Sequence, residues 1–158
     1  MPLKPTEVAD LRSDLLAFTQ HMFRARKGVD LMPAPHHKIV CDALERVVAG
    51  YCPRLIINIP PRSGKTEVAV KNFMAWCMGN FPDSEFIHSS YSKRLATTNT
   101  WESRAIMQHE AFAEVFGAPL FRHDSNAKDE FRTADGGIVY ATGSDGTITG
   151  YGAGKMRD

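Results

Sequence analysis

An apolar run that leads straight into a glycine-containing turn limits the possible architectures of this chain more than any other segment. Leu55 to Ile59 is rich in β-branched residues, and Pro60-Pro61-Arg62-Ser63-Gly64-Lys65-Thr66 follows without a break. Such a run is typical of a buried parallel strand, and a proline cannot continue a central strand. The order of strand, loop and helix is that of a phosphate-binding loop, so the sequence predicts a nucleoside triphosphate site.

The turn carries the residue types that phosphate binding requires. Gly64 allows the backbone to approach a phosphate, and the N–H groups at the start of the next helix point toward it. Lys65 supplies a neutralising charge, and the Thr66 hydroxyl is a ligand for Mg²⁺. The Arg62 guanidinium could reach the γ-phosphate, although a surface arginine beside an anion site explains this residue equally well.

The match to the full phosphate-loop pattern is incomplete. Ile59 stands where the pattern has glycine, five residues before Gly64. The context still favours the motif, because residues 67–78 contain neither glycine nor proline and predict a helix, with Gly79 as its stop. The alternative is an ordinary strand-to-helix turn with Lys65 in solvent.

Composition limits the class of protein. With 158 residues, 43% of them hydrophobic, the chain is long enough for one domain with its own core. A net charge of +1 gives no overall attraction to nucleic acid or anionic lipid. Three cysteines without metal-ligand spacing indicate reduced thiols in a cytosolic protein, and no histidine pair has zinc-site spacing. No apolar stretch approaches the ~20 residues that span a bilayer, so we expect a soluble protein that is not exported.

Apolar spacing predicts the other elements. Amphipathic helices are expected over residues 6–24, with Thr6 as N-cap, and over residues 39–48. A strand at residues 86–91 should precede a long helix from Ser92 to about Glu110. Residues 130–133 and 138–141 flank a turn and predict a hairpin, and a glycine-rich loop follows over residues 143–154. Alternating strands and helices indicate an α/β fold, with a parallel sheet flanked by helices as in P-loop NTPases.

Two groups of charged residues have simple interpretations. Arg24, Arg26 and Lys27 end the first predicted helix and suit its dipole, with a DNA-binding patch as the alternative. Hydrolysis by a P-loop enzyme needs an apolar strand that ends in an acidic residue to order Mg²⁺. No such strand is evident, and the adjacent pair Asp129-Glu130 is typical of a solvated turn. We therefore expect the chain to be the first part of a longer polypeptide, incomplete at its C-terminus.

Several blocks resemble the N-terminal ATPase domain of the large terminase subunit of tailed bacteriophages, the motor that packages DNA into proheads. The most specific is residues 60–67, which looks like that family's deviant Walker A motif and accounts for Ile59. Residues 36–45 look like the helix before the loop, and residues 149–154 resemble the segment that leads into Walker B. Ser90-Tyr91-Ser92, with Leu95, Ala96 and Arg104, looks like the next strand and helix. The resemblance covers about His36 to Gly154.

This resemblance implies a helical lead-in, residues 1–50, and a partial ATPase core, residues 51–158, without the family's nuclease domain. It implies ATP and Mg²⁺ as cofactors, with Arg62 on the γ-phosphate, Lys65 on the β- and γ-phosphates and Thr66 on the metal. The residues implied to contact nucleotide are Pro61, Arg62, Ser63, Gly64, Lys65, Thr66, Glu67 and His37. The region around His36 and His37 would lie near the adenine. An arginine finger acting between subunits is also expected, with Arg104 and Arg157 as candidates.

The resemblance further implies the partners and the location. The partners are double-stranded DNA, the small terminase subunit, the portal protein and neighbouring copies in a ring, in the cytoplasm of the bacterial host. We expect this chain to bind ATP, to turn it over weakly at most, and not to cut DNA. A helicase-type P-loop ATPase is the nearest alternative, and a non-catalytic prophage remnant is the alternative from another class.

Overall fold

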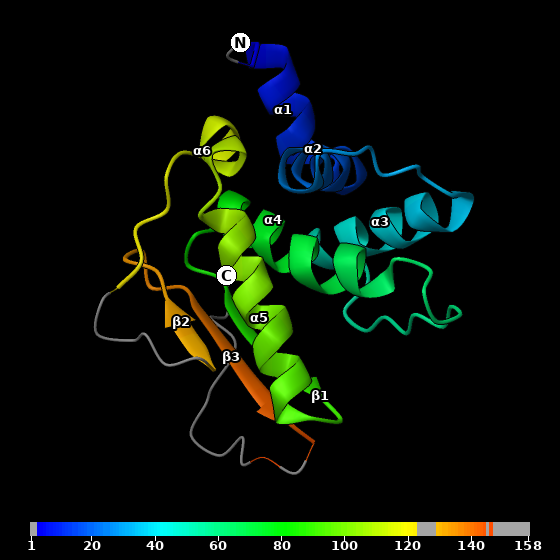
Figure 1. The fold of residues 1–158 in the computed structure, drawn as a ribbon, viewed down its shortest axis with the longest axis vertical. Coiled ribbons are helices and arrows are strands. Elements are labelled where there is room, and N and C mark those ends of the chain that lie inside the picture. Colours follow the sequence, from blue (N-terminus) through cyan, green and yellow to red (C-terminus); the bar gives the residue numbers. More distant parts are fainter. Residues whose placement is uncertain (1–2, 123–128, 145, 147–158) are drawn as a thin grey trace.

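The structure, a computed structural model, describes residues 3–122, 129–144 and 146. These residues form a mixed α/β fold in which helices flank a small three-stranded sheet (Figure 1). In chain order the elements are α1 Pro5–Ser13, α2 Leu15–Lys27, α3 Pro35–Val48, the π-helix η1 Glu67–Asn72, α4 Phe73–Asn80, β1 Glu85–Ser90, α5 Lys93–Met107, α6 Glu110–Phe116, β2 Glu130–Arg132 and β3 Ile138–Gly143.

The sheet is mixed, with the order β1-β3-β2. β1 runs parallel to β3, with Phe86 opposite Val139, and β2 runs antiparallel to β3, with Phe131 opposite Val139. The predicted hairpin is therefore confirmed, whereas the parallel sheet is confirmed only for β1 and β3. Both Val139 and Ala141 are fully buried, and they alternate with half-buried Ile138 and Tyr140, as expected when one face of a sheet carries the core.

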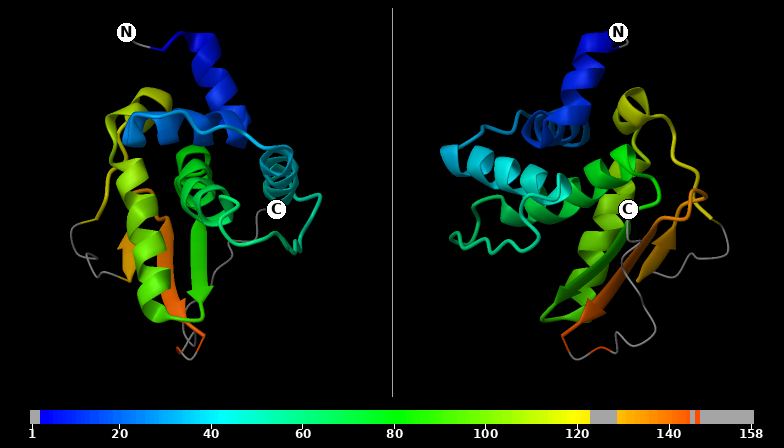
Figure 2. Two further views of the ribbon diagram at one scale, coloured as in Figure 1. Left: turned by 45° about the vertical axis from the view of Figure 1, so that its right-hand side comes forward. Right: turned by 180° about the vertical axis from the view of Figure 1, so that it is seen from behind.

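Helix α5 lies across one face of this sheet and contacts both β1 and β3. Seen from the opposite side, the strands lie in front of α5 with no described helix over them (Figure 2). The other helices gather beyond the N-terminal end of β1, on the far side from its arrowhead (Figures 1 and 2). The sheet and the helical layer therefore meet mainly through α5, which also contacts η1, α4 and α6.

The strand predicted over residues 55–59 is not formed, although residues 52–60 are all described. Leu55 and Ile57 are half-buried and pack against the core, whereas Ile56 between them is 93% exposed. The side chains thus alternate as they would in a strand, but among the described residues no strand pairs with this backbone. A strand needs a neighbour to accept and donate its backbone hydrogen bonds, and so an apolar run alone does not make one.

The helix predicted over residues 6–24 is divided in two at Asp14. Asp14 has φ −119° and ψ 109°, outside the helical region, and its carboxylate accepts a 2.8 Å hydrogen bond from the Ala17 N–H. The preferred N-cap role of aspartate explains the break. Thr6 lies within the first turn of α1, whose N-cap is Lys4, so the capping prediction was wrong.

The predicted helix after the loop is present but longer and less regular than expected. It begins at Lys65 and continues to Asn80, and residues Glu67–Asn72 within it are π-helical. The Asn72 side-chain amide donates to the Glu67 carbonyl at 2.8 Å, which widens the turn by occupying that carbonyl. Gly79 does not stop the helix; a Cβ there would lie 2.6 Å from the Phe116 ring, so glycine is required for close packing.

The long helix predicted from Ser92 to about Glu110 is, in contrast, shorter than expected. Ser92 caps α5 by accepting a hydrogen bond from the Leu95 N–H at 3.3 Å, and α5 ends at Met107. His109 then caps the separate helix α6, because its Nδ1 accepts from the Ala111 N–H at 3.1 Å.

The Gly-rich residues 147–154 and Arg157 lie outside the described residues. Of the helices that are described, none has both the length and the apolar composition needed to cross a membrane.

One hydrophobic core joins the N-terminal helices to the rest of the described chain. It combines residues of α2 and α3 with residues of η1, α4, α5, α6 and the sheet. Its largest fully buried side chains include Phe18, Phe112, Leu15, Met22, Ile106 and Met107. Ile39, placed by the sequence on the buried face of α3, is instead 68% exposed.

The three cysteines are free, and burial gives them different reactivity. Burial raises the pKa of Cys41 and of Cys77 to about 12, from an ordinary 9.0. Cys52 is half-buried and donates a 3.3 Å hydrogen bond to the Arg54 carbonyl. We predict that an aromatic disulfide reagent at about pH 8 will modify Cys52 promptly and the other two only on unfolding, because thiolate is the reactive form.

The same raised pKa values set the sign of a pH effect. An unfolded cysteine ionises near its ordinary value of 9.0, well before Cys41 or Cys77 ionises in the folded protein. The free energy of unfolding should therefore keep its full value below that pH and decrease as the pH rises from it toward 12. Prompt modification of all three thiols in the folded protein, counted by mass spectrometry, would contradict the burial of this pair.

Candidate functional site

The loop before the η1 helix has the backbone form of an anion-binding turn. Arg62 has φ +62° and Gly64 has φ +75°, and Ser63 between them is not among the residues of positive φ. Alternation of φ sign over successive residues turns their N–H groups toward one concave side, which is the arrangement called a nest. Arg62 is the one non-glycine residue of positive φ in the described part of the chain. A strained residue of this kind points to a functional constraint.

Two histidines from α3 contact this loop. The Nε2 atoms of His36 and His37 each lie 3.0 Å from the Ser63 carbonyl oxygen. The Ala34 N–H donates to His37 Nδ1 at 3.0 Å, so the neutral His37 ring carries its proton on Nε2 and donates it to Ser63. His37 is 8% exposed and thus lies beneath the loop, in direct contact with the residues predicted to bind phosphate.

We predict that Gly64→Ala will destabilise the protein more than Gly28→Ala, its matched control. Both glycines have a φ near +70°, a conformation that costs other residues about 1–2 kcal/mol. A Cβ at Gly28 meets nothing within 4 Å, whereas a Cβ at Gly64 would lie 2.7 Å from His37 Nε2. Urea denaturation measures both losses. Equal losses would contradict the contact, and His37→Ala in the Gly64→Ala background should reduce the difference.

The two cations predicted to meet phosphate are exposed and available. Arg62, Lys65 and Thr66 are all exposed. Within residues 3–122, 129–144 and 146, no salt bridge involves Arg62 or Lys65. Lys65 begins the helix, where the first-turn N–H groups have no intrahelical acceptor and the helix dipole is positive. The charges and donors are therefore collected on one short segment.

Glu67, which the resemblance places among the nucleotide contacts, is already paired with cations. Its carboxylate lies 2.8 Å from Arg26 Nη1 and 3.5 Å from Lys71 Nζ. Arg26 thus stands in the last turn of α2, as the interpretation by the helix dipole expects, and its guanidinium is in addition paired with Glu67 and not part of an open basic patch. The spacing of Glu67 and Lys71 is readable from sequence, but nothing local indicates a partner 41 residues away.

Arg104, a candidate arginine finger, lies within the fold. It is 8% exposed, and its guanidinium carbon lies 4.9 Å from the centre of the Phe121 ring and 5.5 Å from that of Trp101. This is cation–π packing between α5 and neighbouring segments. The role as a finger stays a prediction, and Arg157, the other candidate, is outside the described residues.

The acidic pair at the start of β2 is engaged in ion pairs. Asp129 lies 2.6 Å from Lys93, and this hydrogen bond and charge lower the pKa of Asp129 below its ordinary value. Glu130 lies 2.6 Å from Arg132 on the same strand. Neither carboxylate is a free side chain of a solvated turn. Within the described ranges, no group of three or more His, Cys, Asp or Glu side chains could hold a metal ion.

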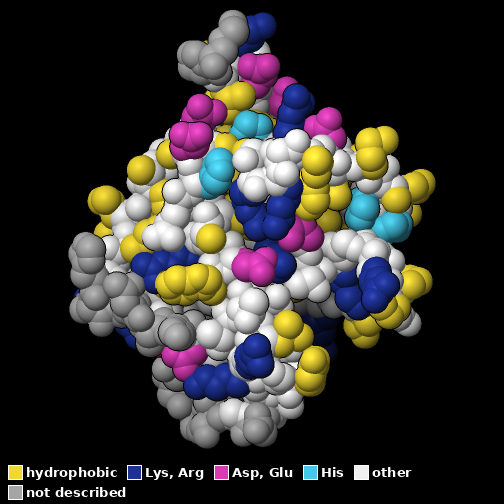
Figure 3. Space-filling view, viewed as in Figure 1, with side chains coloured by type: hydrophobic (Ala, Val, Ile, Leu, Met, Phe, Trp, Pro, Cys, Tyr) yellow, Lys and Arg dark blue, Asp and Glu magenta, His cyan; other side chains and the backbone are white. Residues whose placement is uncertain are grey.

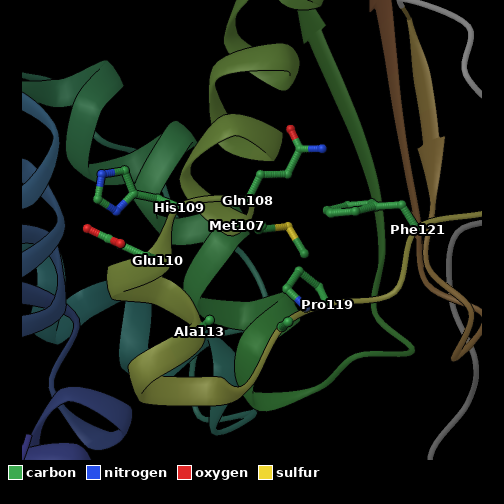
Figure 4. A pocket seen from close by; sticks show the side chains of 8 residues that line it. Met107, Gln108, His109, Glu110, Ala113, Pro119 and Phe121 are labelled. Atoms are coloured by element: carbon green, nitrogen blue, oxygen red, sulfur yellow. The ribbon is translucent and has the colours of Figure 1, made fainter. Parts of the chain in front are cut away.

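A pocket of about 310 Å³ lies away from the loop, between the end of α5, α6 and the segment that follows α6 (Figure 4). Its lining residues are Met107, Gln108, His109, Glu110, Ala113, Ala118, Pro119 and Phe121. No lysine or arginine lines it, and His109 is used as a helix cap. A triphosphate requires positive charge, so this pocket is not the nucleotide site that the sequence predicts.

The surface gives no large region of a single charge in the view of Figure 3. Basic and acidic side chains alternate over this face, and histidines lie beside lysine or arginine side chains over the start of α3 and the loop that follows it. This agrees with a net charge of +1 and leaves any anion binding to local geometry.

In comparisons with family models, with curated proteins and with solved structures, no match to the chain was found.

Proposed function

We propose that residues 61–66 bind the phosphates of a nucleoside triphosphate, with Mg²⁺ as its counter-ion. The observation that carries this proposal is the alternation of φ sign at Arg62, Ser63 and Gly64, directly before the first turn of a helix. A nest and a helix N-terminus both present N–H donors to an anion. Backbone strain of this kind clusters at ligand-binding sites, and anion binding would account for it at Arg62.

Each residue has a role that follows from its chemistry. The ammonium of Lys65 would neutralise phosphate charge, and the guanidinium of Arg62 could form a bidentate contact. The Thr66 hydroxyl, exposed at the first turn, fits a ligand of phosphate-bound Mg²⁺. The metal would neutralise phosphate charge, and water and phosphate oxygens would complete its shell, since Mg²⁺ is usually bound by few protein groups.

The resemblance of residues 60–67 to a terminase Walker A motif extends the proposal to the biological process. On that ground alone, we propose that the chain is the ATP-binding part of a viral DNA-packaging motor, which couples ATP hydrolysis to movement of double-stranded DNA. The carboxyl ends of β1 and β3 carry Ser89, Ser90, Thr142 and Gly143, which are not the carboxylates that hydrolysis needs. We therefore assign nucleotide binding, and not turnover, to the described residues.

Calorimetric titration of the purified chain with ATP, in the presence and absence of Mg²⁺, tests the proposal. Saturable binding of one ATP that is strengthened by Mg²⁺ and displaced by pyrophosphate would support a phosphate-directed site. Binding that adenosine displaces and pyrophosphate does not would place recognition on the base and contradict the assignment to residues 61–66. No binding at millimolar ATP would overturn it.

A further inference from the structure

Four charged side chains connect the start of the η1 helix to α2 and α5. Glu67 pairs with Arg26 of α2 at 2.8 Å, and Lys71 lies between Glu67, at 3.5 Å, and Glu102 of α5, at 2.5 Å. The side chains of Arg26, Glu67 and Lys71 are only 13–17% exposed, and that of Glu102 is 37% exposed. Two cations and two anions therefore form a neutral, largely buried chain, which we call the Glu67 network.

Both oxygens of the Glu67 carboxylate are occupied within this network. Oε1 accepts from Arg26 Nη1 and, at 3.1 Å, from the Asn72 side-chain amide, while Oε2 faces Lys71. The Asn72 amide also donates to the Glu67 carbonyl and is fully buried. Glu67 is thus fixed through both its side chain and its backbone. Glu67 lies two residues after Lys65, at the start of the π-helical turn.

We infer that Glu67 is a positioning residue for the phosphate loop, and that it acts through Arg26, Lys71 and Asn72 without touching nucleotide or metal. The inference rests on the proposed phosphate binding by residues 61–66. Fixing Glu67 against α2 and α5 fixes the first helical turn, whose N–H groups and Lys65 would meet the phosphates. A site that binds by preorganised donors loses affinity when their support is removed.

Glu67→Gln separates this role from a simple effect of charge. Removing a negative charge near a bound anion would, through space, tighten nucleotide binding. Removing the ion pairs that position the first turn would weaken it. The two explanations thus predict opposite signs for one isosteric substitution. We expect Mg²⁺-ATP to bind about 10-fold more weakly, a loss typical of altering a supporting residue.

The experiment combines two measurements on the full chain. Calorimetry gives the Kd for Mg²⁺-ATP, and amide hydrogen exchange without nucleotide gives the local stability of residues 68–72, beginning with Val68, whose N–H donates to the Gly64 carbonyl at 3.0 Å. Glu67→Gln should speed exchange at these residues and leave exchange in α6 unchanged. Asp42→Asn is the matched control, because Asp42 forms an i,i+4 ion pair with Lys38, at 3.0 Å, on the exposed face of α3. It should change neither measurement.

The outcomes distinguish this inference from the proposed function. If the unmodified chain binds no Mg²⁺-ATP, the proposed function fails, and exchange at residues 68–72 alone decides whether Glu67 fixes the turn. If the unmodified chain binds but Glu67→Gln leaves the Kd unchanged or lowers it, the inference is overturned. If Glu67→Gln does not fold, Glu102→Gln removes the outer, more exposed end of the network. It should weaken binding in the same direction, and an unchanged Kd would overturn the inference.

Discussion

Lys65→Ala should reduce the affinity for Mg²⁺-ATP by roughly 10- to 100-fold, the largest functional effect that we expect of one substitution. A hydrogen bond from a charged group contributes about 1.5–3 kcal/mol, and each 1.4 kcal/mol corresponds to about tenfold in Kd. Lys65 is exposed at the first turn of the helix, so the substitution removes charge without opening the core. Calorimetric titration with Mg²⁺-ATP measures the change.

The matched control is Lys27→Ala, which removes the same charge from another exposed lysine, in the last turn of α2. It should leave nucleotide affinity nearly unchanged, because it lies outside residues 61–66. Both variants should unfold within about 0.5 kcal/mol of the unmodified chain, as surface substitutions usually do. Equal effects of the two variants on affinity would show a non-specific charge effect, and an unchanged Kd for Lys65→Ala would remove Lys65 from the site.

The parts of the fold that could be predicted from the sequence are those with local causes. The β2–β3 hairpin follows from a turn between two short strands, α3 from apolar spacing, and α5 from apolar spacing that starts after Ser92, its N-cap. Pairing partners are not local. The run Leu55–Ile59 has the composition of a strand, yet among the described residues it has no strand to pair with. Breaks that depend on one polar side chain were also missed, such as the capping carboxylate of Asp14.

The candidate site divides in the same way. Gly64, Lys65 and Thr66 were identifiable because phosphate binding restricts residue types within a few positions of one loop. The contacts that support the loop join residues far apart in the chain. His36 and His37 reach Ser63 across 27 and 26 residues, and Arg26 reaches Glu67 across 41. The resemblance had already placed His36, His37 and Glu67 near the nucleotide, but sequence spacing carries no information about such pairs, so these supporting contacts became visible only in the structure.

The largest loss of stability should come from Phe18→Ala. Phe18 of α2 is fully buried, and its ring packs edge-on against Phe112 at 6.2 Å and Phe116 at 5.7 Å between ring centres. Replacing a core phenylalanine with alanine costs about 3–5 kcal/mol, because apolar burial is lost and a cavity remains. For a chain of this size, that corresponds to a decrease of roughly 6–20 °C in Tm, which differential scanning calorimetry measures.

Two further variants isolate the cause of this loss. Phe18→Leu keeps most of the buried volume and should cost less than about 1.5 kcal/mol, close to the effect of other hydrophobic exchanges. Tyr91→Ala removes an aromatic ring that is 82% exposed and should change stability by no more than about 0.5 kcal/mol. A loss for Phe18→Ala no greater than that for Tyr91→Ala would mean that α2 does not pack on α6.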